Sequence, residues 1–330
     1  MTPPRDEAAK RVIETPHLRL EIADSGYVSG IRGGTLRDKA TGAVDLGFGL
    51  AVADFLLEPA DPNVPIPEGQ YEFGPNNAVH GNIPKRYVEG PQICTQAKTL
   101  TPVIGRGPDF TTVTMTYRWN VAYNAGSSAG SLWKQTIIVP DDTRYIFCAD
   151  RVTTVSKSEA LSLRVDMPGH LRHDRDGEFE HVYLSYNDPS ILPSTEFMID
   201  FPPDAKFLYT RGVSPRPKRM IRAYQVTARP GRDEGPWLAG MTLNVDDVAQ
   251  AWCHQRGYVC LIEEIGGRPT RPGDTFGAAY LIGWFDDIDA MNRAYDDHAG
   301  WSGLALDGPE DKPTGYRGLS ARALSPVVVS

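Results

Sequence analysis

The hydrophobic pattern of the chain consists mainly of short runs with a period of two, the spacing typical of β-strands. Apolar and polar residues alternate over 17–22 and 110–119. Compact, largely apolar runs occupy 133–139, 144–155, 258–262 and 276–285. Because side chains alternate between the two faces of a strand, these runs predict strands with one or both faces buried. We therefore expect an all-β protein built as a large antiparallel β-sandwich with few short helices.

Helical patterns are rare. Residues 286–295 begin with acids and carry apolar residues at helical spacing, which predicts an amphipathic helix favoured by its dipole. Residues 245–252 predict a short helical turn with Asn244 as its N-cap.

One domain is the economical interpretation of the 330-residue chain. We assign residues 15–300 to it, preceded by a leader over 1–14 and followed by an extension over 301–330 that packs on it. No apolar run approaches the ~20 residues of a membrane span, so we expect no contact with a membrane.

Composition narrows the function classes. A net charge of -8 and a pI near 5.4 argue against a general nucleic-acid binder, because neutralising phosphates needs a basic surface. The polar start of the chain has no apolar segment of a signal peptide, so we expect a cytoplasmic protein. The cysteines lie at spacings typical of neither disulfide frameworks nor metal sites, and we interpret them as reduced core thiols: Cys94, Cys148, Cys253 and Cys260.

The most informative stretch is an apolar strand that leads into two acids. Tyr258–Ile262 predicts a buried strand, Glu263 and Glu264 follow it, and a turn is expected over 266–269. Since side chains alternate, one carboxylate must share a face with the buried residues and is therefore enclosed. Such a group is a candidate general base; the alternative is a solvated pair that closes the strand. Cations close in sequence that could set its pKa are Arg256, Arg268 and Arg271.

A second stretch, residues 71–87, concentrates hydrogen-bonding side chains in a segment interrupted by glycine and proline. Several donors converging from one loop suit a polyol ligand. The alternative is a solvated loop whose histidine caps a turn. The candidate binding residues are Asn77, His80, Lys85 and Arg86.

A third stretch, residues 161–173, alternates and then reaches two histidines. Arg164 and Asp166 share one face of the predicted strand, which places a charged pair beside the candidate site. His170 and His173 follow, and His173 also belongs to a charge cluster that is typical of a surface. His254, before the glutamate strand, is either a further active-site imidazole or a core histidine.

These motifs resemble those of the galactose mutarotase-like (aldose 1-epimerase-like) family. The resemblance rests on Gly33-Gly34-Thr35-Leu36-Arg37-Asp38 with Thr41-Gly42, on Val79-His80-Gly81, and on Cys260-Leu261 before the two acids. It implies the family's β-supersandwich, with the ligand held on a face of a sheet.

The resemblance also implies roles for individual residues. Glu263, or else Glu264, would take the proton of the anomeric hydroxyl, while His170, or His173, protonates the ring oxygen. His80 would lie in the sugar site, and Arg86 or Lys85 would bind hydroxyls. This chemistry requires no metal and no redox cofactor. The other expected substrate-binding residues are Asn77, Arg164, Asp166, His254 and Trp252.

The sequence therefore predicts a carbohydrate-active enzyme that uses His/Glu acid–base chemistry on a mono- or oligosaccharide, acidic ones included. One alternative is a lyase that abstracts a proton beside a carboxylate; another is a glycoside hydrolase with Asp166 and Glu264 as its two carboxylates. A non-catalytic saccharide-binding module stays open too, as does assembly into a homo-oligomer.

Overall fold

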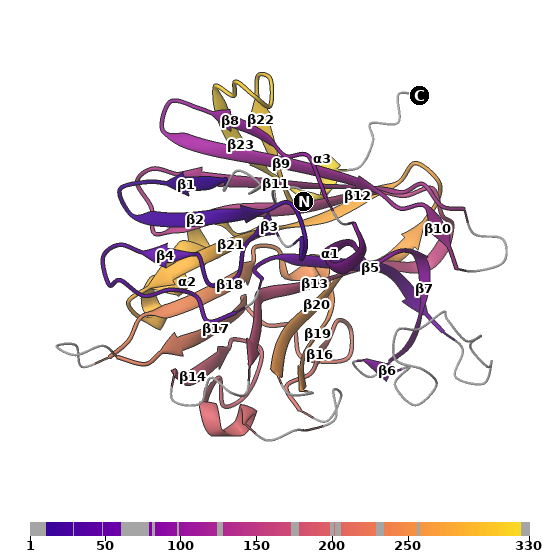
Figure 1. Cartoon of the computed structure of the whole chain (residues 1–330). Helices are drawn as coiled ribbons and strands as arrows, with labels where there is room; N and C mark the ends of the chain where they lie inside the picture. Colours follow the sequence, from indigo (N-terminus) through magenta and orange to yellow (C-terminus); the bar gives the residue numbers. More distant parts are fainter. Residues whose placement is uncertain are drawn as a thin grey trace, which may run out of the picture.

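The computed structural model describes residues 11–324, except for 29, 48, 61–78, 81–82, 98, 124–127, 173–177, 199–200, 202–205, 229–233 and 256–257. Two large antiparallel sheets pack face to face, with two smaller sheets and short helices around them (Figure 1). The all-β sandwich predicted from the hydrophobic pattern is confirmed.

The first large sheet has nine strands, and its centre comes from the long apolar runs noted in the sequence. In spatial order they are β15 (Ile191–Pro193), β14 (Phe179–Leu184), β17 (Met220–Val226), β18 (Trp237–Thr242), β21 (Thr275–Phe285), β12 (Tyr145–Thr153), β11 (Leu132–Pro140), β9 (Phe110–Arg118) and β8 (Val103–Arg106).

The second large sheet has eight strands, and its two longest strands, β13 and β20, are neighbours. In spatial order they are β10 (Val121–Ala122), β7 (Ile83–Gly90), β5 (Val52–Pro59), β13 (Ser158–Arg172), β20 (Tyr258–Thr270), β19 (Val248–Gln255) and β16 (Tyr209–Thr210), with β6 (Val79–His80) paired to β7.

The remaining elements are two small sheets and several short helices. One small sheet comprises β1 (Val12–Glu14), β2 (Leu18–Ala23), β3 (Gly30–Ile31) and β4 (Arg37–Asp38), and a hairpin comprises β22 (Gly303–Asp307) and β23 (Gly315–Leu319). The helices are α1 (Ile93–Gln96), α2 (Ile288–His298) and α3 (Ala321–Leu324), with 3-10 turns η3 (Ser194–Phe197) and η4 (Val245–Asp247).

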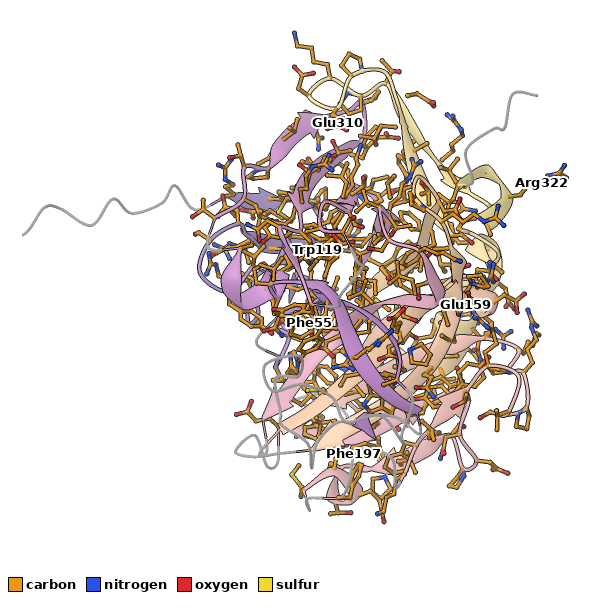
Figure 2. All side chains as sticks on the ribbon, turned by 90° about the vertical axis from the view of Figure 1, so that its right-hand side faces the viewer. Phe55, Trp119, Glu159, Phe197, Glu310 and Arg322 are labelled. Atoms are coloured by element: carbon orange, nitrogen blue, oxygen red, sulfur yellow. The ribbon has the colours of Figure 1, made fainter. Side chains whose placement is uncertain are left out.

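Side-chain alternation divides the apolar residues into layers. The main core lies between the two large sheets and takes alternate residues of each, such as Val165 and Leu261 from one sheet and Ile282 from the other. A second cluster covers the opposite face of the nine-stranded sheet, where α2 and the β22–β23 hairpin pack. Figure 2 shows Glu310, in the hairpin's loop, at one end of the molecule and Phe197, in η3, at the other. The eight-stranded sheet has one face in the main core. Its other face, called the outer face below, is turned away from that core.

Most local predictions are confirmed, and two are wrong in an instructive way. The helix near 286–295 forms as α2 with Asp287 as its N-cap. Asn244 caps only the 3-10 turn η4, and the rest of the predicted helical turn is strand β19, whose backbone pairs with β20. β20 does not end at the two glutamates: Gly266 and Gly267 adopt positive φ of 96° and 60°, and the strand continues to Thr270.

Within the described residues, no helix combines the length and the apolarity that crossing a bilayer requires. Of the leader predicted over 1–14, the structure describes residues 11–14, and Val12–Glu14 form β1.

Candidate functional site

The two glutamates lie in the middle of β20, on opposite faces of the eight-stranded sheet. β20 pairs with β13 so that Glu263 is opposite Val165 and Glu264 is opposite Arg164. Val165 belongs to the core between the sheets, so Glu263 points into the core and Glu264 points to the outer face. Both are almost completely buried, at 0% and 2% exposure, so the alternative of a solvated pair is wrong.

Glu263 has partners from the opposite sheet. Its Oε1 lies 3.1 Å from Nη2 of Arg222 on β17, and the Thr242 hydroxyl of β18 donates a hydrogen bond to its other oxygen. Burial raises the pKa of Glu263, against the opposing effects of Arg222 and Thr242. Arg222 is itself fully buried and donates to the Leu261 carbonyl. This arrangement links the two sheets and offers no space to a ligand.

Glu264 lies between two cations on the outer face. Its Oε2 is 2.8 Å from Nζ of Lys85 on β7, and its Oε1 is 3.1 Å from Nη2 of Arg164 on β13. Lys85 also donates to Oε1 of Gln250 at 2.5 Å, and the Gln250 amide donates to the Thr210 hydroxyl at 3.1 Å. Five strands of the eight-stranded sheet therefore contribute to one hydrogen-bonded group: β7, β13, β16, β19 and β20.

Trp252 forms the floor of this group. Lys85 Nζ lies 4.4 Å from its ring centroid and the Arg164 guanidinium carbon lies 5.5 Å from it. Trp252 is fully buried under the two cations, so it supports them and does not present its ring to a ligand. Burial lowers the pKa of Lys85 to about 8, with a smaller contribution from Arg164, although Glu264 opposes the shift.

A cavity of about 140 Å³ opens beside this group. Lys85 and Glu264 line it together with a second acid, Glu58 of β5, whose carboxylate binds Arg86 at 2.6 Å and the Ser158 hydroxyl at 2.6 Å. The other polar side chains of the lining are Ser162, Thr210, Arg211 and Gln250.

Two buried donors beside the cavity group lack acceptors among the described residues. They are Nε of Arg164 and Nε1 of Trp252. Buried polar groups nearly always find a hydrogen-bond partner, so these two donors are unusual. Neither residue lines the cavity; Arg164 contacts Glu264 and Trp252 contacts Lys85, which do line it.

His170 lies on the same outer face but farther along the strands. His170 is opposite Cys260 on β20, whereas Arg164 is opposite Glu264. Cys260 and Glu264 are four residues apart, so His170 and Glu264 are separated by roughly 13 Å along the strand direction. His170 Nε2 is 3.0 Å from Oδ2 of Asp166. The sheet therefore places the imidazole and Glu264 in different groups along one polar face.

The other predicted binding residues are only partly described. Arg86 is half-exposed and paired with Glu58 at the cavity's edge. The backbone of His80 pairs with Ile83 and that of His254 with Cys260, but their side chains lie outside the described part of the structure. Asn77 and His173 lie outside the described residues altogether.

Sequence reasoning missed Gln250, Thr210 and Glu58. Gln250 and Trp252 share a face of β19, a signal that was lost because 248–252 was interpreted as helical. Of the nearby arginines expected to act on the glutamates, Arg256 lies outside the described residues. Arg268, expected to serve the glutamates, donates to the Asp246 carbonyl instead.

A larger cavity of about 340 Å³ lies elsewhere, between the turn that follows β20 and helix α3. Asp247, Arg268 and Asp274 contribute to its lining, but none of the predicted catalytic or substrate-binding residues does. The smaller cavity is the better candidate, because a buried acid, Glu264, and a buried amine, Lys85, line it together.

Comparison with known proteins gave matches among solved structures only: no protein-family model and no curated protein sequence matches the chain. One structure, assigned as an aldose 1-epimerase of Escherichia coli K12, is 11% identical with a TM-score of 0.39, over 84% of this chain and 99% of that one. A galactose mutarotase-like protein of Lactobacillus casei ATCC 334 is 11% identical with a TM-score of 0.38, over 83% and 99%.

An α-mannosidase of Enterococcus faecalis V583 is 12% identical with a TM-score of 0.48; the match covers 92% of this chain and 34% of the mannosidase. Two of these three structures carry the family name to which the sequence motifs pointed. At such identities and TM-scores the likeness concerns the fold alone, and it assigns no role to any residue.

Proposed function

We propose that the protein is a carbohydrate-active enzyme that performs acid–base chemistry at the hemiacetal carbon of a sugar bound in the 140 Å³ cavity. Glu264 is the base that accepts the proton of the anomeric hydroxyl, and Lys85 is the acid that donates to the ring oxygen. The ring then opens and recloses, which interconverts the anomers.

The observation that carries this proposal is the closeness of the acid and the base. Lys85 Nζ and Glu264 Oε2 are 2.8 Å apart, and both line the cavity. The ring oxygen and the anomeric oxygen of a sugar are bonded to the same carbon, so a catalyst that addresses both needs its two groups close together. A hemiacetal inserted between them exchanges one ion pair for two hydrogen bonds. The pair formed by His170 and Glu264 does not meet this condition.

Cavity size and charge favour one sugar ring. About 140 Å³ is well below the ~300–1,000 Å³ typical of sites for larger ligands, so a monosaccharide fits better than an oligosaccharide. The nearby cations Lys85, Arg164 and Arg211 outnumber the acids Glu58 and Glu264, which suits a sugar that carries a carboxylate.

A second candidate is glycoside hydrolysis. It is favoured by one observation, that two carboxylates, Glu58 and Glu264, line the same cavity. In this reaction Glu58 replaces Asp166 as the second acid, since Asp166 lies in the His170 group.

Exchange NMR tests the proposal. The protein is added to neutral aldoses and to uronic acids, and the rate of exchange between the α and β anomers is measured. We expect at least one sugar to exchange faster than in buffer, with the largest effect on an acidic sugar. Hydrolysis is followed in parallel by release of the aglycone from aryl glycosides, and lyase action by ultraviolet absorption of unsaturated uronates.

The outcomes separate the alternatives. Aglycone release without faster exchange would select the hydrolase, and new ultraviolet absorption would select the lyase. Saturation-transfer signals from a bound sugar that undergoes no reaction would overturn catalysis and leave a saccharide-binding module.

A further inference from the structure

Asp166, His170 and Cys260 form a second group on the outer face of the eight-stranded sheet. One ligand-type atom from each, a carboxylate oxygen, an imidazole nitrogen and the thiol sulfur, lies within 4.8 Å of the others. All three residues are at least nine-tenths buried, with exposures of 3%, 5% and 5%. The chemistry proposed above uses none of them.

An irregularity in β13 assembles this group. Asp166 and His170 are four residues apart, a separation of about 13 Å in a regular strand. Their partners on β20, Ile262 and Cys260, are only two residues apart, so β13 takes up two extra residues between them. Asp166 and His170 are therefore only roughly 7 Å apart along the strand direction, and both side chains lie on the same face of the sheet as Cys260.

Gly169 makes the irregularity possible. Its φ is +95°, and a Cβ at this position would lie 1.8 Å from the carbonyl oxygen of Gly49. Only glycine combines this backbone conformation with so close an approach. The strand is therefore specifically shaped at the point where it brings Asp166 and His170 together.

The polar atoms of the group are incompletely satisfied. Asp166 Oδ2 contacts His170 Nε2 at 3.0 Å, but Asp166 Oδ1 has no hydrogen-bond partner among the described residues, although it is buried. Buried negative charge with an unused acceptor oxygen favours a bound cation.

We propose that Asp166, His170 and Cys260 bind one divalent transition-metal ion of the Zn²⁺ type. Zinc takes thiolate, imidazole and carboxylate ligands, whereas Ca²⁺ and Mg²⁺ take oxygen ligands. Zinc–ligand bonds are ~2.0–2.3 Å long, so at tetrahedral angles two ligand atoms on one ion lie ~3.3–3.8 Å apart. The three ligand atoms here lie within 4.8 Å of one another, so the side chains close the site by moving together by about an ångström.

The ion would cross-link β13 and β20 near the ends of both strands. Cys260 binds as the thiolate, and its proton passes to solvent as the metal binds. Three protein ligands leave one tetrahedral position for water or another small ligand. The site shares no ligand with the Lys85–Glu264 pair: Cys260 lies four residues from Glu264 along β20, and Asp166 is opposite Ile262, two residues from Glu264.

Cobalt titration tests the site directly. Full-length protein is treated with a chelator, the chelator is removed, and Co²⁺ alone is added while the absorption spectrum is recorded. We expect one equivalent of Co²⁺ to bind with an intense thiolate-to-cobalt charge-transfer band, and Zn²⁺ to displace it. Wild-type protein that binds no Co²⁺, or binds it without this band, would overturn the proposal.

Matched variants identify the ligands. Cys260→Ser is expected to abolish the band, whereas Cys253→Ser, a buried free cysteine that faces the core from β19, keeps it. Asp166→Asn is expected to keep the band and weaken Co²⁺ affinity by at least ~10-fold, since even residues that only support a ligand contribute ~10–100-fold. Folding of each variant is checked by circular dichroism. A band that survives Cys260→Ser, or an unchanged affinity in folded Asp166→Asn, would refute the assignment.

Discussion

Glu263→Gln and Glu264→Gln make the same chemical change at adjacent positions of β20 that face opposite sides of the sheet. Each removes the charge that balances buried cations, and breaking a buried ion pair in this way costs about 3–5 kcal/mol. We expect Glu263→Gln to cost the full amount, because Arg222 is fully buried and an arginine does not lose its proton.

Glu264→Gln leaves two cations, but one of them can be neutralised. The pKa of Lys85 is already about 8, so deprotonating it at pH 7 costs about 1.4 kcal/mol, and less once Glu264 is gone. The other cation, Arg164, keeps its charge, but the carboxylate of Asp54 also stabilises it, so the free energy of unfolding should fall less than in Glu263→Gln. The anomer exchange rate should behave in the opposite way: loss of a general base lowers it by about 10²–10⁴-fold in Glu264→Gln, and Glu263→Gln leaves it nearly unchanged.

Urea denaturation gives the two unfolding free energies, and exchange NMR gives the rates at a temperature where circular dichroism shows both variants folded. The paired design separates a damaged fold from a damaged site, because the variant with the larger stability loss should be the active one. If Glu263→Gln loses exchange activity while Glu264→Gln keeps it, the assignment of the two faces to core and site is refuted.

Three further variants probe other buried groups. Burial raises the pKa of Asp150 from 3.8 to about 7, so its contribution to stability is complete below pH 3.8 and is lost as the pH rises through 7. Asp150→Asn, which keeps an acceptor for Trp133, should remove this pH dependence and add up to about 4 kcal/mol at pH 8, as measured by urea denaturation across pH. If protonated Lys85, which faces Glu264 and Arg164, is the acid, exchange activity should fall as the pH rises through about 8, where Lys85 loses its proton. In a pH–rate profile, Lys85→Arg should move this fall in activity to higher pH. A fall at the same pH in the variant would exclude Lys85 as the acid. Gly169→Ala should lower the unfolding free energy by about 1–3 kcal/mol or more in urea denaturation, since it strains a backbone at φ +95°, and an unaffected variant would contradict the tight packing described for this bend.

The strand pattern was accessible from sequence because it is local. Alternation with a period of two identified β2 and β9, and the acids followed by apolar residues at helical spacing identified α2. The same local rule required one of the two adjacent glutamates to be enclosed. Burial of the second was not accessible in this way, because it depends on what covers the outer face of the sheet.

Long-range pairing decided the partners. The cations at Glu264 come from Lys85 and Arg164, far from it along the chain, because β7 and β13 belong to the same sheet as β20. No spacing in the sequence marks such neighbours, so the nearby arginines were chosen instead. The continuation of β20 through Gly266 and Gly267 was hidden for a related reason: two glycines favour a turn in isolation, and only the pairing with β13 keeps them in a strand.

The sequence by itself therefore determined the fold class, most strands and the presence of an enclosed carboxylate, since these follow from side-chain periodicity. Only the tertiary structure decided which glutamate faces a cavity, and only the extra residues in β13 brought Asp166 within two residues of the level that His170 and Cys260 share. Strand register causes both results, because a shift of one residue exchanges the two faces of a strand.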